Sequence, residues 1–218
     1  MAEVGARTRL REEALNLFGR QGVQGTSTRA ILDAAGMKNP SAISYHFGSK
    51  GELVEDLVGE LIRGTAPVLQ LQIELAKGSS PPTVEEWTAI AVDSAVNLIA
   101  SERGCLLACL WAEYDGSMQP RALETFLVSG NPVASAWQTA VASTFPLLPQ
   151  HLAVSRNVIM FRTLEWMIAR RAGRILSVNP SPTLKMDDTT KFRQLIFEVA
   201  LAIVSAPSEL GDDDITMG

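Results

Sequence analysis

The sequence predicts an all-α protein, with a small N-terminal helical domain followed by a larger one, over a chain of 218 residues. Apolar residues recur at three- and four-residue spacing along most of the chain, which is the pattern of amphipathic helices. Residue types that begin or end helices separate these stretches. No stretch shows the sustained alternation of apolar and polar residues that a half-buried strand requires.

The first predicted helix covers residues 7–20. Leu10, Ala14 and Phe18 recur at four-residue spacing, so they share one face, and Gly22 supplies a stop. This segment is therefore expected to be an amphipathic helix that packs through a single apolar face.

Two short helices are predicted next. Thr26 is a suitable N-cap for the second helix, which Gly36 ends because glycine readily adopts a positive φ. Asn39 is a suitable cap for the third, with Pro40 in its first turn and its end near Phe47.

The third helix has two unlike faces. At about 100° per residue, Ile43 and Phe47 share one face, and Ser41, Ser44 and Tyr45 share the other. One face is suited to packing and the other to hydrogen bonding. Two short helices joined by a tight turn, the second with an exposed polar face, are typical of a DNA-binding helix-turn-helix.

Later helices begin at two capping boxes, Ser49 to Glu52 and Thr83 to Glu86. The loop at residues 77–82 separates them. Asp115-Gly116 is predicted to end a helix. Further helices are predicted over residues 104–115, 120–144, 150–175 and 188–205.

Charge divides the chain into two regions. The net charge is −5 overall, which by itself argues against a nucleic-acid partner. Residues 1–50, however, hold seven cations and four anions, a net charge of +3, and the rest holds twelve cations and twenty anions, a net charge of −8. The predicted domains are therefore a helix-turn-helix at residues 1–50, a body at 51–210 and a disordered tail at 211–218.

The predicted DNA contacts combine hydroxyl, amide and cationic side chains around the third helix. Hydroxyl and amide groups suit base edges or phosphates, and lysines suit phosphates. Tyr45 is favoured as a contact, whereas His46 fits phosphate contact and end-of-helix packing equally well. The predicted set is Thr26, Thr28, Lys38, Asn39, Ser41, Ser44, Tyr45, His46 and Lys50.

A series of positions in the first quarter of the chain resembles the tetracycline-repressor (TetR) family of transcriptional regulators. These positions are Ala14, Leu17 and Phe18, then Gly22, Thr26-Ser27, Ile31, Ala35-Gly36 and the segment YHFGSKGEL from Tyr45 to Leu53. Three features depart from the family pattern. The stretch AGMKNPSAISYHF is one residue longer than usual, Ser44 lies where the family often has a phosphate-contacting tyrosine, and Thr28 stands where an apolar residue is common.

The resemblance implies a homodimer that binds a palindromic double-stranded DNA operator and, as a repressor, is released from it by a small molecule bound in the acidic region. Aromatic residues of that region favour an apolar or aromatic effector, although ordinary core packing explains each of them equally well. These residues are Trp87, Trp111, Tyr114, Phe126 and Trp137.

Apolar stripes on the last two predicted helices suit either a dimer bundle or the internal core. The terminal position of these helices and the family resemblance favour the dimer. The stripe residues are Phe161, Leu164, Ile168, Phe192, Leu195, Ile196, Val199 and Ile203.

Other classes of protein are disfavoured. Cys105 and Cys109 lie in an apolar helix, which indicates buried, inert thiols, and no metal site or cofactor motif is recognisable. No apolar run is long enough to span a membrane, so a cytoplasmic protein is expected. Two alternatives remain: a DNA-binding regulator without a small-molecule effector and, less favoured, a helical enzyme, for which Glu113 and Asp115 are the nearest approach to a carboxylate pair.

Overall fold

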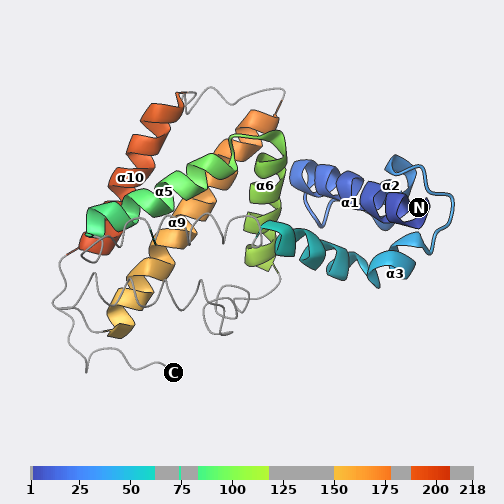
Figure 1. The fold of residues 1–218 in the computed structure, drawn as a ribbon, viewed down its shortest axis with the longest axis horizontal. Helices are drawn as coiled ribbons and strands as arrows, with labels where there is room; N and C mark the ends of the chain where they lie inside the picture. The colour runs from blue at the N-terminus through green and yellow to red at the C-terminus, as the bar shows by residue number, and fades with distance from the viewer. Residues whose placement is uncertain (1, 62–73, 75–82, 118–149, 178–187, 207–218) are drawn as a thin grey trace. The chain divides into compact units, whose positions relative to one another are not determined.

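The computed structural model describes residues 2–61, 74, 83–117, 150–177 and 188–206 (Figure 1). Every regular element among these residues is an α-helix, so the all-α prediction is confirmed. The predicted loop at 77–82, the predicted helix at 120–144 and the predicted tail at 211–218 lie outside the described residues. No single described helix has the length and apolar character of a membrane span. Only Val84–Leu98 and Glu102–Tyr114 taken together, across the bend between them, meet that criterion.

Most helix boundaries agree with the sequence pattern to within a few residues. Asp115-Gly116 does not end a helix, because α6 continues to Ser117, and one glycine within a helix costs only about 1 kcal/mol. The second helix is capped by Ser27 rather than Thr26. The labelled helices are α1 (Ala2–Gln21), α2 (Thr28–Ala34), α3 (Ala42–Phe47), α5 (Val84–Leu98), α6 (Glu102–Ser117), α9 (Gln150–Leu176) and α10 (Thr189–Ser205).

The chain divides into two compact units, which we describe separately. The first unit comprises Met1–Thr65, Leu98–Ala122 and Ile168–Thr183, and the second comprises Ala66–Asn97, Leu123–Met167 and Leu184–Gly218. The first unit therefore includes the three N-terminal helices, the helix at residues 50–61 and α6.

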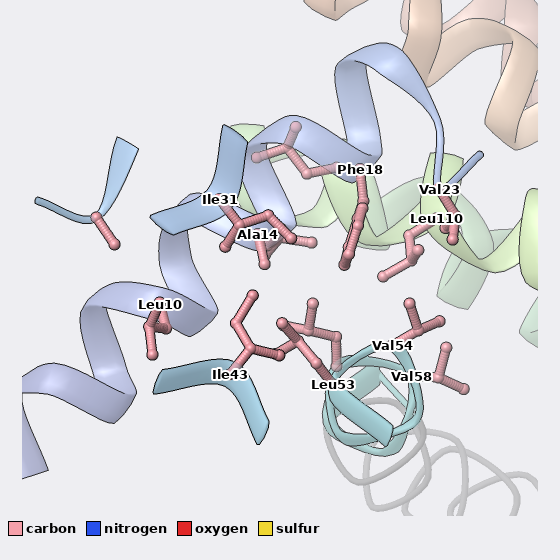
Figure 2. Close-up of a cluster of buried hydrophobic side chains, with 14 of the residues drawn as sticks. Leu10, Ala14, Phe18, Val23, Ile31, Ile43, Leu53, Val54, Val58 and Leu110 are labelled. Atoms are coloured by element: carbon pink, nitrogen blue, oxygen red, sulfur yellow. The ribbon is translucent and has the colours of Figure 1, made fainter. Parts of the chain in front are cut away.

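A continuous apolar core holds the first unit together. Phe18 of α1, Ile31 of α2 and Ile43 of α3 are buried with side chains from the helix at 50–61 and from α6 (Figure 2). Within this unit α1 contacts both α2 and α6, and α2 contacts α3. Since burying a large aliphatic or aromatic side chain contributes roughly 1.5–3 kcal/mol, this core fixes how the short helices pack.

Side-chain caps begin two helices of the second unit, α5 and α10. Before α5, the Thr83 amide donates to the Glu86 carboxylate (2.8 Å) and the Glu86 amide donates to the Thr83 hydroxyl (3.2 Å), which completes the predicted capping box. The Asp188 side chain caps α10 by accepting hydrogen bonds from the Thr190 and Lys191 amides. Arg193 of α10 forms an ion pair with Asp93 of α5, so charge links these two helices.

A network of ion pairs joins α1, the helix at 50–61 and α6 in the first unit. Arg11 of α1 contacts Asp56 and Glu60, each at 2.5 Å. Arg7 contacts Asp56 at 2.9 Å. Arg103 of α6 contacts Glu60 at 2.7 Å and also pairs with Glu12 of α1.

This network lowers the pKa values of its two shared carboxyls. Burial opposes ionisation of Asp56, but hydrogen bonds and charges from Arg11 and then Arg7 outweigh it, so its pKa lies below the ordinary 3.8. For Glu60, the hydrogen bond from Arg103 is the largest cause, and its pKa lies below 4.5 despite burial. Both carboxylates therefore stabilise the folded state in their charged form.

We predict that the first unit loses stability as the pH falls below about 4.5, the ordinary pKa of a glutamate. The unfolded chain takes up protons on these carboxyls before the folded chain does, so protonation favours unfolding, and the loss is complete below the folded pKa values. Urea unfolding between pH 6 and pH 3 measures this slope. The double variant Asp56→Asn, Glu60→Gln should have a shallower slope, whereas Glu55→Gln, an exposed change on the same helix, should keep it. An unchanged slope in the double variant would contradict the prediction.

Candidate nucleic-acid interface

The loop between α1 and α2 determines where the candidate interface begins. After α1 ends at Gln21, Gly22 adopts φ +79°, and a Cβ there would lie 2.9 Å from the Glu113 carboxylate oxygens. Thr26 is buried, and its hydroxyl donates to the Gly22 carbonyl at 2.8 Å. Its side chain therefore holds the loop together and is not exposed for DNA contact, contrary to the expectation for this residue.

Lys50 holds the same loop from the following helix. Its ammonium donates to the Val23 and Thr26 carbonyls, each at 2.6 Å, and lies 5.9 Å from the centre of the Phe18 ring. The sequence predicted a phosphate contact for this lysine. In the structure its ammonium hydrogen-bonds to loop carbonyls, and hydrogen bonds from a charged donor are strong, so a contact with phosphate stays a prediction.

Glu113 of α6 completes the fixation of the loop. Its carboxylate accepts from the Val23 amide at 2.8 Å and from the Gln24 amide at 3.4 Å. The loop thus has its carbonyls satisfied by a lysine and its amides by a glutamate. The sequence pattern indicates Glu113 only as half of a weak carboxylate pair, since no local signal marks a residue that pairs with a loop 90 positions earlier.

The turn between α2 and α3 is built from local signals. Gly36 has φ +66°, and the Met37 amide donates to the Leu32 carbonyl at 2.8 Å, which closes the end of α2. Asn39 accepts from the Ser41 amide at 2.9 Å through its side-chain oxygen. Asn39 therefore shapes the turn but is not the N-cap that the sequence predicts, because α3 begins at Ala42 with Ser41 as its N-cap.

Helix α3 presents the two faces that its sequence predicts. Ala42 and Ile43 are buried in the core of the first unit, and Ser41, Ser44 and Tyr45 are exposed. The exposed face is therefore polar, short and supported from beneath by apolar packing, which is the arrangement a helix needs to enter a DNA major groove.

Aromatic contacts continue along the end of α3. His46 is half-buried, its ring centroid 4.9 Å from that of Tyr45 and 6.4 Å from that of Phe47. The Arg7 guanidinium lies over the Phe47 ring at 4.8 Å. His46 thus takes part in packing, the second of the two roles that its sequence position allowed, and its contact with phosphate is untested.

Most of the N-terminal cations are exposed, and several of them form ion pairs at the surface. Arg29 forms an ion pair with Asp33 at 3.0 Å, and Arg20 pairs with Glu102. Lys38 and Arg9 are exposed, and within the described residues neither forms an ion pair. Thr28, the first residue of α2, and Asn39, in the turn before α3, are also exposed. The exposed side chains from the predicted DNA-contacting set are therefore Thr28, Lys38, Asn39, Ser41, Ser44 and Tyr45.

The described residues among the candidate effector contacts do not lie together in one unit. Trp111 and Tyr114 of α6 pack against the core of the first unit, with ring centroids 6.3 Å apart. Burial, and then the charge of Glu55, raise the pKa of Tyr114. Trp87 is fully buried in the second unit, and Phe126 and Trp137 lie outside the described residues.

The candidate dimer residues are divided between interior and surface. Leu164, Ile168, Phe192 and Ile196 are buried within the chain, as the internal-core alternative expects. Phe161, Val199 and Ile203 are half-buried, and Leu195 is exposed. Two other large apolar residues on α9 are more exposed, Ile159 at 55% and Trp166 at 62%.

The cysteines behave as inert thiols. Cys105 is buried and its Sγ lies 3.4 Å from the Ile99 carbonyl, and Cys109 lies 3.7 Å from the Ala169 carbonyl. Burial raises the pKa of both, that of Cys109 to about 11. Among the described residues, no cluster of three or more histidine, cysteine, aspartate or glutamate side chains is placed to hold a metal ion.

Comparison with known proteins identifies the N-terminal region. Residues 10–57 match the family model for bacterial regulatory proteins of the tetR family. The chain is 38% identical over 68 residues to "Probable HTH-type transcriptional regulator YttP" of Bacillus subtilis, a match covering 31% of this chain and 32% of that protein. It is 42% identical over 67 residues to the HTH-type transcriptional regulatory protein RaaS of Mycobacterium tuberculosis, covering 29% of this chain and 31% of that protein. The match thus spans about a third of each curated relative.

Solved structures resemble the chain over most of its length. A bacterial regulatory protein of the tetR family from Rhodococcus RHA1 has a TM-score of 0.60 at 17% identity, covering 91% of this chain and 96% of that one. Mycobacterium smegmatis AmtR has a TM-score of 0.56 at 20% identity, covering 93% and 87%. At these identities the likeness establishes the fold. The relatives are transcriptional regulators and not enzymes.

We predict that two lysines of the interface have separable roles. Lys50→Met should lower the free energy of unfolding by about 1.5–3 kcal/mol, because two loop carbonyls lose a charged donor. Lys38→Met, an exposed change, should alter it by no more than about 0.5 kcal/mol. Urea unfolding of both variants tests this difference, and equal stabilities would contradict the assignment of Lys50 to the loop.

Proposed function

We propose that the whole chain is a cytoplasmic transcriptional repressor that binds a palindromic operator as a homodimer and is released by a small molecule. Its residues 10–57 match the family model for bacterial regulatory proteins of the tetR family. The observation that carries DNA binding is the exposed polar face of α3, whose opposite face, at Ala42 and Ile43, is buried in the core of the first unit. A preformed helix of this kind binds DNA without first being ordered.

Dimerisation supports this proposal on electrostatic grounds. Several N-terminal cations are paired with carboxylates or backbone carbonyls of the same chain, so one copy offers phosphate only a limited net positive charge. Two copies double the phosphate contacts and place two α3 helices at half-sites about 34–36 Å apart. A palindromic operator is the sequence that matches two-fold symmetry of this kind.

Release by an effector is the part of the proposal that rests on the family resemblance and on the aromatic residues. Trp87 lies in the interior of the second unit, which makes the surroundings of α5 the first place to seek an apolar or aromatic ligand. A ligand that binds the DNA-free conformation better would lower operator affinity by shifting the population toward it.

We expect the protein to select a palindrome from a pool of random duplexes. Fluorescence anisotropy with the selected sequence should show an affinity that falls linearly on a logarithmic salt scale, and Lys38→Met should reduce that slope by about one for each bound copy. Failure to enrich any sequence would contradict the proposal.

Compounds that raise the melting temperature of the protein are then added to the protein–DNA complex. Release of DNA by such a compound supports control by a small-molecule effector. Stabilising compounds that leave operator affinity unchanged would favour a regulator without a small-molecule effector.

We also expect the exposed face of α9 to carry the dimer contact. Ile159 and Trp166 are seven residues apart, so they lie on one face two helical turns apart. Trp166→Glu should weaken dimerisation at least tenfold, because it places a charge in an apolar interface. Ile175→Glu, an exposed change on the opposite side of the same helix, should leave it unchanged. Analytical ultracentrifugation at micromolar concentration measures this, and an unaltered dimer in Trp166→Glu would exclude this face.

A further inference from the structure

Tyr45 is an unusual residue for the surface of the N-terminal helices. Its side chain is 71% exposed, and the other large apolar side chains of comparable exposure among the described residues lie on α9 and α10. An exposed aromatic ring on a helix that otherwise buries its apolar side chains indicates a contact with another molecule. Under the proposed function, that molecule is DNA.

The ring of Tyr45 is held by its neighbours. It meets the His46 ring edge-on, with centroids 4.9 Å apart and planes at 79°, and His46 in turn contacts Phe47. Edge-to-face pairs of this kind stabilise one ring orientation. Tyr45 is therefore positioned before any partner binds, and ordering it requires little further loss of side-chain entropy.

The composition of α3 limits what the other exposed residues can specify. The helix has the sequence AISYHF, so it has no arginine, lysine, asparagine or glutamine. Those side chains make the bidentate base contacts that distinguish guanine or adenine in the major groove. The hydroxyls of Ser41 and Ser44 both donate and accept, so they bond to several base edges and discriminate weakly.

The remaining discriminating group on this face is the Tyr45 ring. The apolar group that a major groove offers is the C5 methyl of thymine. We propose, resting on the proposed DNA-binding function, that Tyr45 is a specificity-determining residue whose ring packs on a thymine methyl in each half-site. His46 is then a positioning residue that orients this ring.

Replacing single thymines of the selected operator by deoxyuridine tests this inference, because the change removes the methyl group and keeps base pairing. Binding of the wild-type protein should weaken about fourfold at one thymine in each half-site, the factor expected for burial of one methyl-sized group. Tyr45→Phe should keep this sensitivity and Tyr45→Ala should lose it. Ile175→Ala, a change at an exposed residue of α9, serves as the control that keeps both affinity and sensitivity. Since Tyr45 is exposed, its variants should fold, which circular dichroism checks.

The outcomes separate this inference from the proposed function. If an operator is bound but no deoxyuridine substitution weakens binding, the proposed function stands and the thymine contact is overturned. If Tyr45→Phe weakens binding to all sequences as much as Tyr45→Ala does, the hydroxyl contacts phosphate, and the inference is likewise overturned. If no operator is selected at all, both proposals fail.

Discussion

The loop between α1 and α2 is the constraint on which the geometry of the N-terminal helices depends. It changes the chain direction at Gly22, and its polar groups would be costly to leave unsatisfied beside an apolar core. Lys50 satisfies carbonyls of this loop and Glu113 satisfies amides. Because both partners are charged, these hydrogen bonds are stronger than neutral ones and hold α2, and through it α3, in one orientation.

The same arrangement explains why the charge of the N-terminal region is a poor guide to its affinity for DNA. A net charge of +3 over residues 1–50 suggests a basic surface. In the folded chain, however, Arg7 and Arg11 pair with carboxylates of the helix at 50–61, and Lys50 faces backbone carbonyls. Much of the positive charge therefore stabilises the fold, and exposed cations such as Lys38 remain for phosphate.

The features predicted correctly from the sequence are those that local chemistry determines. Positive φ at Gly22 and Gly36, and the division of α3 between Ile43 and Tyr45, follow from residue type and helical periodicity. The N-cap of α2 differed by one position, because Thr26 and Ser27 have similar capping chemistry and only the core determines which of them is buried. The partners of Lys50 and Glu113 could not be predicted, since such contacts depend on packing between distant segments.

Under the proposed function, these two results bear on how the protein would distinguish its operator from other DNA. Non-specific binding comes almost entirely from cations on phosphates, so ion pairs that partly neutralise the N-terminal cations weaken binding to random sequence. The specificity ratio is the affinity for the operator divided by the affinity for random DNA. When binding to random DNA is weak, each base contact contributes a larger share of the affinity for the operator. A face of hydroxyls with one fixed aromatic ring can then discriminate without the bidentate side chains that strongly basic DNA-binding helices use. Under the proposed function, pairing of the cations with carboxylates of the same chain and exposure of the Tyr45 ring would both favour the operator over random sequence.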